Sequence, residues 1–244
     1  MSPNNLKVFG YYIVVLLALS CSCQPGRSRF GVLEPLSGFY VECLDNNCFP
    51  LEACSIDREG DTVVVRYIFR SEDCLCSSGA KLLTDCSEGW KVSVNGMPMY
   101  GLSAISGVVQ EGENTVELRG SGEAPSVSLV GAFDVLSSEE GLYLRSAKSP
   151  GFGSFSSQGL LLYDGQVSYR RQYEVAGKVG KRILRVGKWS GSRCEVYVNY
   201  DKVADVTSQH CKLDIGPYLT PGPNDVEVRI SGPDPGLLKA FTLK

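Results

Sequence analysis

The sequence is poor in the residues on which many enzymes and nucleic-acid-binding proteins depend. Its 244 residues include one histidine, His210, two tryptophans and three methionines. A single histidine excludes multi-histidine metal sites, and His210 has no Gly-x-Ser-x-Gly motif to serve in a hydrolase triad. Positive charge is also scarce, because 24 basic residues against 27 acidic ones leave a net charge of −3. We therefore expect neither a nucleic-acid partner nor an enzyme.

Long apolar stretches are nearly absent. The one unbroken run, residues 11–19, is shorter than the roughly 20 residues of a membrane-spanning helix. It precedes the small residues Ala18 and Ser20, so residues 1–23 are predicted to be a signal peptide, and the protein to be secreted or displayed on the cell surface. Cleavage after Ser20 would leave Cys21 first, as in bacterial lipoproteins. Cys21 is therefore a lipidation candidate that would attach the chain to a membrane, with an uncleaved N-terminal anchor as the alternative.

Cysteine is the residue type in surplus. Of ten cysteines, Cys21 and Cys23 lie in the predicted export segment, and the other eight are predicted to form disulfides, as in many exported proteins. Cys194 and Cys211 have only each other nearby in the sequence, so we expect them to pair. The connectivity of the other six stays open: Cys43, Cys48, Cys54, Cys74, Cys76 and Cys86. Zinc binding at Cys74-x-Cys76 is the competing interpretation, but the spacing does not match Cys-x2-Cys.

The chain is rich in turn residues and in alternating patterns. It has 27 glycines and 12 prolines, and Val226, Val228 and Ile230 alternate with Glu227 and Arg229. Residues 61–70 are β-branched or aromatic at both alternating sets of positions, as in a strand covered on both faces. No long stripe with a 3.6-residue period occurs. These patterns predict an all-β protein.

An internal repeat divides the chain in two. Residues 90–119 and 194–229 share a strand that ends at asparagine and a second strand that follows a Gly-x-Asn turn. The matched pairs are Asn95 and Asn199, Gly112 and Gly222, Asn114 and Asn224, Glu117 and Glu227, and Arg119 and Arg229. Glycine and asparagine tolerate left-handed turns, which predicts a structural role for these asparagines. We expect one β-sandwich at 30–136, containing the cysteine cluster, a linker at 137–158, and a second sandwich at 159–244.

The repeat and three further motifs resemble a known family. The VxVNG…GxNxVEVR pattern is similar to galactose-binding-like jelly-roll domains of glycoside hydrolases. Residues 44–54, 128–135 and 159–169 resemble successive segments of the non-catalytic C-terminal part of large α-L-rhamnosidase-like glycosidases. The resemblance implies two tandem jelly-roll β-sandwich domains without the catalytic barrel. The chain departs from the pattern at Leu161 and Leu162, which replace Pro-Phe, and at Tyr200, which replaces glycine and makes a tight turn there unexpected.

Sugar binding by such a domain requires exposed aromatic rings and polar groups on loops. The candidates in the second domain are Tyr163, Asp164, Trp189 and Tyr200. For Tyr163 and Trp189 the alternative is that they fill the end of the sandwich core. No cofactor is expected beyond a structural calcium ion, for which Asp164 or Asp201 would be ligands. The acids that can be placed, Glu117, Glu174 and Glu227, are predicted to point outward from strands.

Three functions follow from these features. The first is an exported, non-catalytic carbohydrate-binding or accessory protein that engages a glycan surface. The second is a structural surface or filament subunit that self-assembles through exposed sandwich edges. The third is a divergent accessory subunit of a glycosidase.

Overall fold

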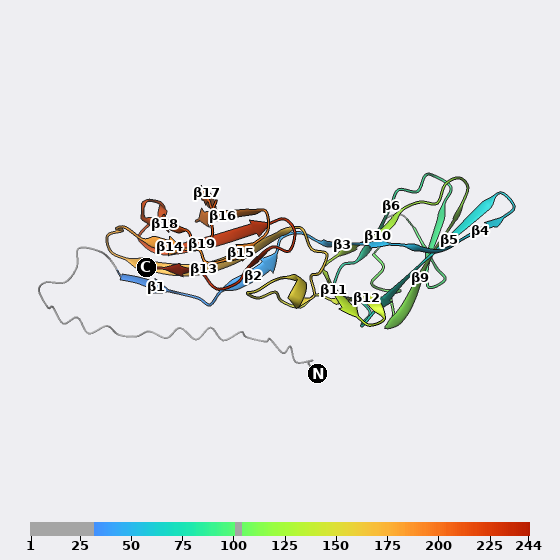
Figure 1. Ribbon diagram of the computed structural model, residues 1–244, viewed down its shortest axis with the longest axis horizontal. Helices are drawn as coiled ribbons and strands as arrows, with labels where there is room; N and C mark the ends of the chain where they lie inside the picture. Colours follow the sequence, from blue (N-terminus) through green and yellow to red (C-terminus); the bar gives the residue numbers. More distant parts are fainter. Residues whose placement is uncertain (1–31, 101–103) are drawn as a thin grey trace, which may run out of the picture.

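The computed structural model describes residues 32–100 and 104–244. They form 21 strands and two short 3-10 helices, which confirms the all-β prediction. Figure 1 shows two bodies along the long axis, one holding β4–β9 and the other holding β13–β20 and the C-terminus. The predicted signal peptide, residues 1–23, and the lipidation candidate Cys21 lie outside the described residues.

The N-terminal sandwich packs a large sheet against a small one. The large sheet has the order β11-β12-β5-β9-β7-β8, with β4 paired to β5, and the small sheet has the order β3-β10-β6. Alternating side chains of both sheets, such as Val65 and Leu129, are fully buried between them. The bounds of the strands are β3 Asn47–Leu51, β4 Ala53–Glu59, β5 Thr62–Ser71, β6 Lys81–Thr84, β7 Lys91–Val94, β8 Met97–Met99, β9 Gly112–Gly120, β10 Val127–Gly131, β11 Phe133–Ser138 and β12 Gly141–Ser146.

The C-terminal sandwich is built on a six-stranded sheet of order β1-β13-β19-β16-β17, with β2 also paired to β13. Two small sheets, β18-β14-β21 and β15-β20, complete it. Its core includes Tyr169, Val196 and Val228. The bounds are β1 Val32–Pro35, β2 Tyr40–Cys43, η1 Ser156–Gln158, β13 Gln166–Ala176, β14 Ile183–Arg185, β15 Trp189–Ser190, β16 Arg193–Val198, β17 Asp201–Asp205, β18 Lys212–Asp214, η2 Gly216–Tyr218, β19 Gly222–Ser231, β20 Gly236–Leu237 and β21 Thr242–Leu243.

The domain boundaries differ from the predicted ones at two places. Residues 32–43, predicted to open the first sandwich, instead pair with β13 of the second, with Val32 opposite Ala176 and Tyr40 opposite Arg170. The long strand β13 would otherwise present an edge of unpaired backbone groups, and β1 and β2 cover that edge end to end.

The predicted linker is also shorter than its composition suggests. Residues 141–146 form β12, which pairs with β11 and extends the first sandwich. Residues 137–141, of sequence SSEEG, form a hairpin turn there, in which Gly141 has a φ of +114°. The chain passes between the two sandwiches at residues 44–46, between β2 and β3, and again at residues 147–165, between β12 and β13, where η1 lies.

Candidate functional site

The repeated asparagines hold turns in both sandwiches, as predicted. Asn199 Nδ2 donates to Asn224 Oδ1 at 3.0 Å, and the Asn199 side-chain oxygen accepts from Asp225 N at 2.9 Å. Asn224 Nδ2 in turn donates to the carbonyl of Thr220 at 2.7 Å. In the first sandwich, Asn95 makes the same bond to Asn114, at 2.8 Å. These four side chains are therefore structural.

Tyr200 forms a tight turn despite the expectation that it would not. Asn199 and Tyr200 have φ values of +52° and +72°, and the flanking residues Val198 and Asp201 are paired directly. This is the two-residue hairpin that Asn95 and Gly96 form in the first sandwich, at +51° and +78°. The asparagine bonds hold the turn closed, so tyrosine occupies a left-handed position that glycine takes without a steric cost.

The Tyr200 side chain is 68% exposed and lies beside a second exposed ring, that of Tyr40, at 57%. We call the hollow of about 270 Å³ at these rings the tyrosine pocket. Its lining is Ser37, Tyr40, Arg170, Arg171, Gln172, Tyr200 and Asp225. It combines residues from β2, β13 and β19 with the turn between β16 and β17. Residues far apart in sequence are thus brought together by sheet order.

Polar groups at the tyrosine pocket are open to a ligand. Gln172 and Asp225 are directly opposite on β13 and β19. Within the described residues, their side-chain amide and carboxylate make no hydrogen bond or ion pair. Arg170 lies with its guanidinium 5.6 Å from the Tyr40 ring centroid and is fixed by Glu42 at 3.2 Å. The pocket therefore offers two rings, an amide, a carboxylate and a positioned cation.

Other charged side chains on the same sheet as the tyrosine pocket form ion pairs with one another. Glu227, predicted to point into solvent, is buried. Ser168 donates to it at 2.6 Å and Arg229 pairs with it at 2.6 Å, and these bonds offset the cost of burying its charge. Glu195 is held by Lys202 at 2.6 Å. Burial raises the pKa of Glu195, but its bonds to Lys202 and Tyr197 and the nearby Arg193 outweigh this and hold the pKa below its usual value. These groups satisfy one another, whereas the Gln172 amide and the Asp225 carboxylate at the tyrosine pocket have no such partner within the described residues.

The other three predicted sugar-binding residues lie elsewhere. Tyr163 is only 2% exposed, and its hydroxyl donates to the Gln166 carbonyl at 2.6 Å, so it fills the end of the core. Burial raises its pKa. Asp164 is exposed in the same loop, just before β13. Gln166 and Gln172 are six residues apart on that strand, about 20 Å at ~3.4 Å per residue, so Asp164 is remote from the tyrosine pocket.

Trp189 also belongs to the core rather than to the tyrosine pocket. It pairs with Leu237 in β15 and β20 and packs against the buried cluster of the second sandwich. Its indole nitrogen is buried with no hydrogen-bond partner in the described part of the chain. Tyr40 and Gln172 were not predicted as site residues. Tyr40 could not be identified from the sequence as a residue of this pocket, because residues 30–136 were predicted to belong to the first sandwich.

The structure has the eight cysteines at positions 43–211 as thiols, and the disulfides expected among them stay predictions. Cys48 and Cys54 are exposed on β3 and β4, and Cys74 and Cys76 are exposed together in the loop between β5 and β6, where their side chains interact. Burial raises the pKa of Cys194 to about 12, and the proximity of Cys211 and Glu195 adds to the rise. Cys194 and Cys211 are thus neighbours, and their disulfide stays a prediction.

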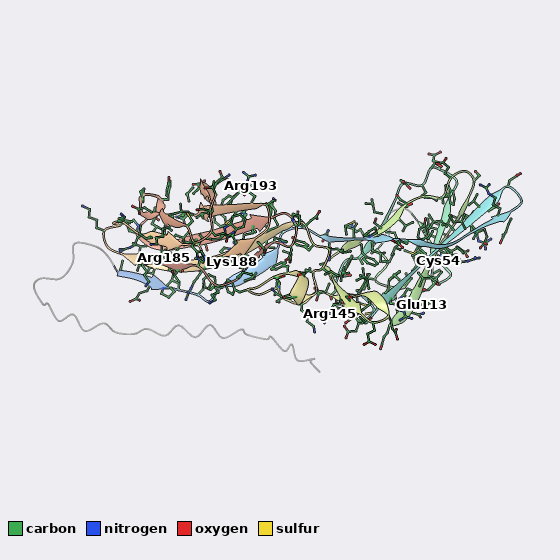
Figure 2. All side chains as sticks on the ribbon, viewed as in Figure 1. Cys54, Glu113, Arg145, Arg185, Lys188 and Arg193 are labelled. Atoms are coloured by element: carbon green, nitrogen blue, oxygen red, sulfur yellow. The ribbon has the colours of Figure 1, made fainter. Side chains whose placement is uncertain are left out.

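Two further features of the described residues bear on chemistry. No cluster of three or more His, Cys, Asp or Glu side chains in residues 32–100 and 104–244 is arranged to hold a metal ion. A hollow on the first sandwich gathers Glu72, Glu111, Glu113 and Glu140, of which Glu113 is labelled in Figure 2. The side chains of Glu72 and Glu140 are 57% and 74% exposed, so water surrounds these carboxylates instead of a closed site.

No protein-family model and no curated protein sequence matches the chain. Among solved structures it is similar to a rhamnosidase from Novosphingobium sp. PP1Y, at 16% identity and a TM-score of 0.33 over 84% of this chain and 24% of that one. It is also similar to the Streptomyces avermitilis alpha-L-rhamnosidase, at 13% identity and a TM-score of 0.29 over 75% and 23%. A third is the Beta-D-Mannosidase from Dictyoglomus thermophilum, at 12% identity and a TM-score of 0.23 over 84% and 33%.

The chain thus spans a quarter to a third of the length of these glycosidases. Because all three TM-scores lie below 0.5, function has to be derived from the geometry of the chain itself. The galactose-binding-like type of the two sandwiches stays a prediction. No helix among the described residues is long and apolar enough to cross a membrane.

Proposed function

We propose that this protein is a non-catalytic carbohydrate-binding protein and that the tyrosine pocket of its C-terminal sandwich is the sugar site. The supporting observation is Tyr200, an exposed aromatic residue at a left-handed turn position where its counterpart in the repeat is Gly96. A bulky residue in this conformation costs about 1–2 kcal/mol, and such strain is concentrated at functional sites.

The chemistry of the pocket matches a sugar ring. The apolar C–H face of a pyranose packs on aromatic rings, which Tyr40 and Tyr200 offer to solvent. The hydroxyl groups of the sugar would bond to the Gln172 amide and the Asp225 carboxylate, which have no partners within the described residues. A shallow site of this kind binds weakly, and several copies on a surface would strengthen binding through avidity.

A glycan array probed with the purified full chain tests this proposal. Tyr200→Gly and Tyr40→Ala should each weaken binding to the best neutral glycan about tenfold or more, equivalent to ~1.4 kcal/mol. Tyr218→Ala is the matched control, because Tyr218 is a half-exposed tyrosine of the same sandwich outside the pocket. Unchanged binding in the pocket variants, or no glycan binding by the folded chain, contradicts the proposal.

We also propose that the chain is exported and held at a cell surface through Cys21. This proposal follows from residues 1–23 alone. The mass of the N-terminal peptide from the natural source tests it, with a diacylglyceryl-modified Cys21 expected. An intact residue 1 would contradict it.

A further inference from the structure

A second pocket of the C-terminal sandwich concentrates positive charge. We call this hollow of about 480 Å³ the basic pocket. Its lining is Arg185, Val186, Gly187, Lys188, His210, Lys212, Leu238, Lys239, Ala240 and Thr242. It contains four cations and the only histidine of the chain, with no acidic residue in the lining, although the whole chain has a net charge of −3. It shares no residue with the tyrosine pocket.

These four cations are not neutralised by the protein. In the described residues, the ion pairs involve eight other basic residues: Arg66, Arg70, Arg119, Arg145, Arg170, Arg193, Lys202 and Arg229. Arg185 and Lys212 are directly opposite each other on β14 and β18, a like-charge pair that destabilises a sheet. An anion between them would relieve this repulsion.

The backbone around the basic pocket is held in place by three loops that bond to one another. His210 N donates to the Gly187 carbonyl at 3.2 Å, and Val186 N donates to the Cys211 carbonyl at 3.0 Å. Leu238 N donates to the Lys188 carbonyl at 3.0 Å. His210 itself has a φ of +58°, a strained position for a residue with a side chain. Arg185 and Lys188 are labelled in Figure 2 on the body that holds the C-terminus.

The lining also has an apolar part. Val186, Leu238 and Ala240 lie among the cations, and Val186 is part of the buried core. A ligand that fills the pocket therefore needs an apolar face as well as negative charge. Apart from His210, the lining has no aromatic ring on which a nucleobase would stack.

We infer that the basic pocket binds an anionic sugar residue, one carrying a carboxylate or a sulfate ester. The negative charge of the ligand follows from the pocket alone, whereas the assignment to a sugar rests on the proposed function. The guanidinium of Arg185 would bind the anionic group through two parallel hydrogen bonds, and Lys188, Lys212 and Lys239 would add charge around it. The C–H face of the sugar would pack on Leu238 and Ala240, which are the exposed apolar residues of the lining.

The experiment measures the affinity of the full chain by calorimetry for two anionic polysaccharide probes, dextran sulfate and polygalacturonate oligomers. Neutral dextran and single-stranded DNA are the comparison probes. The test variant is Lys188→Glu with Lys239→Glu. The matched control is Lys178→Glu with Lys181→Glu, which makes the same charge change at exposed positions of the same sandwich outside the pocket. We expect the test variant to lose at least tenfold in affinity for one anionic probe, and the control to lose no more than about twofold. The preferred probe distinguishes sulfate from carboxylate.

Three results would overturn the inference. Equal losses in the two variants would mean that binding is diffuse attraction to net charge. No binding of either anionic polymer would mean that the pocket takes no such ligand. Single-stranded DNA bound by the pocket more tightly than both anionic probes would replace the sugar with a nucleic acid.

The two pockets can be separated in the same assay. Tyr200→Gly should leave the affinity for the anionic probe unchanged, and Lys188→Glu with Lys239→Glu should leave the affinity for the neutral glycan unchanged. If neither the unmutated chain nor any variant bound a neutral glycan, while the unmutated chain still bound the anionic probe, the proposed function would be rejected and the anion site would stand.

Discussion

At the scale of single residues, the two copies of the repeat differ at one informative place. Gly96 and Tyr200 occupy equivalent left-handed turn positions, but only Tyr200 carries a side chain there. Nothing lies within 4 Å of where a side chain at Gly96 would begin, so space does not explain the difference. The left-handed backbone conformation of Tyr200 is therefore what costs free energy, and its result is an aromatic ring exposed at the turn.

This strain is measurable by urea unfolding. Tyr200→Gly should leave the free energy of unfolding unchanged or raise it by up to about 1 kcal/mol, because glycine adopts this φ freely. The reciprocal Gly96→Tyr should lower it by about 1 kcal/mol. A loss of more than about 1 kcal/mol in Tyr200→Gly would show that the ring supports the fold and would remove the argument for a binding role.

Cysteine reactivity gives a second prediction at this scale. In the reduced, folded chain at about pH 8, Cys194 should resist iodoacetamide, because burial raises its pKa to about 12 and only the thiolate reacts. The exposed Cys48 and Cys54 should react.

Peptide mass spectrometry locates the labels. Repeating the labelling without reductant tests the predicted pairing, and a linked Cys194–Cys211 peptide is the expected product. Rapid alkylation of Cys194 in the folded chain would contradict its burial.

At the scale of elements, the strands are joined by side chains as well as by backbone ladders. Asn224 is buried, and it bonds to the Thr220 backbone on one side and to Asn199 on the other. It therefore ties the start of β19 to the turn that carries Tyr200. In the first sandwich, Asn114 bonds in the same way to the Gln110 backbone and to Asn95. It therefore ties the start of β9 to the turn that carries Gly96.

The two asparagines form a matched pair for mutation. Asn224→Ala and Asn114→Ala should each destabilise their own sandwich by about 2–3 kcal/mol, since buried backbone groups lose their partners. Only Asn224→Ala should also weaken neutral-glycan binding, because it releases the Tyr200 turn. Denaturant unfolding with a glycan titration measures both effects. Equal loss of glycan binding in the two variants would contradict the positioning argument.

At the scale of the whole molecule, the chain crosses between its sandwiches more often than its sequence suggests. It starts in the C-terminal sandwich with β1 and β2, builds the N-terminal sandwich, and then returns. Leu33, Phe39 and Val41 of the first segment pack against the core of the C-terminal sandwich. The two ends of the described chain therefore belong to one folding unit.

A fragment of residues 147–244, which keeps Phe152, Phe155 and η1 of this sandwich, should consequently fail to fold alone. It would expose the edge of β13 and the core surface that β1 and β2 cover. Adding a peptide of residues 32–44 should restore the sheet, as measured by circular dichroism and amide hydrogen exchange. A scrambled peptide is the control. Cooperative unfolding of the fragment by itself would contradict this assignment of β1 and β2.

The sequence by itself determined the all-β class, the repeat and the turn role of its asparagines. These depend on periods of two residues and on the tolerance of Gly and Asn for left-handed φ, which are local properties. The tertiary structure alone decided that residues 32–43 join the far sandwich and that Tyr163 is buried. It also decided that Tyr40 and Tyr200 line one hollow and that Arg185, Lys188 and His210 line another. Strand order and register between distant segments set these outcomes, and no local pattern encodes which strand edge a short strand will cover.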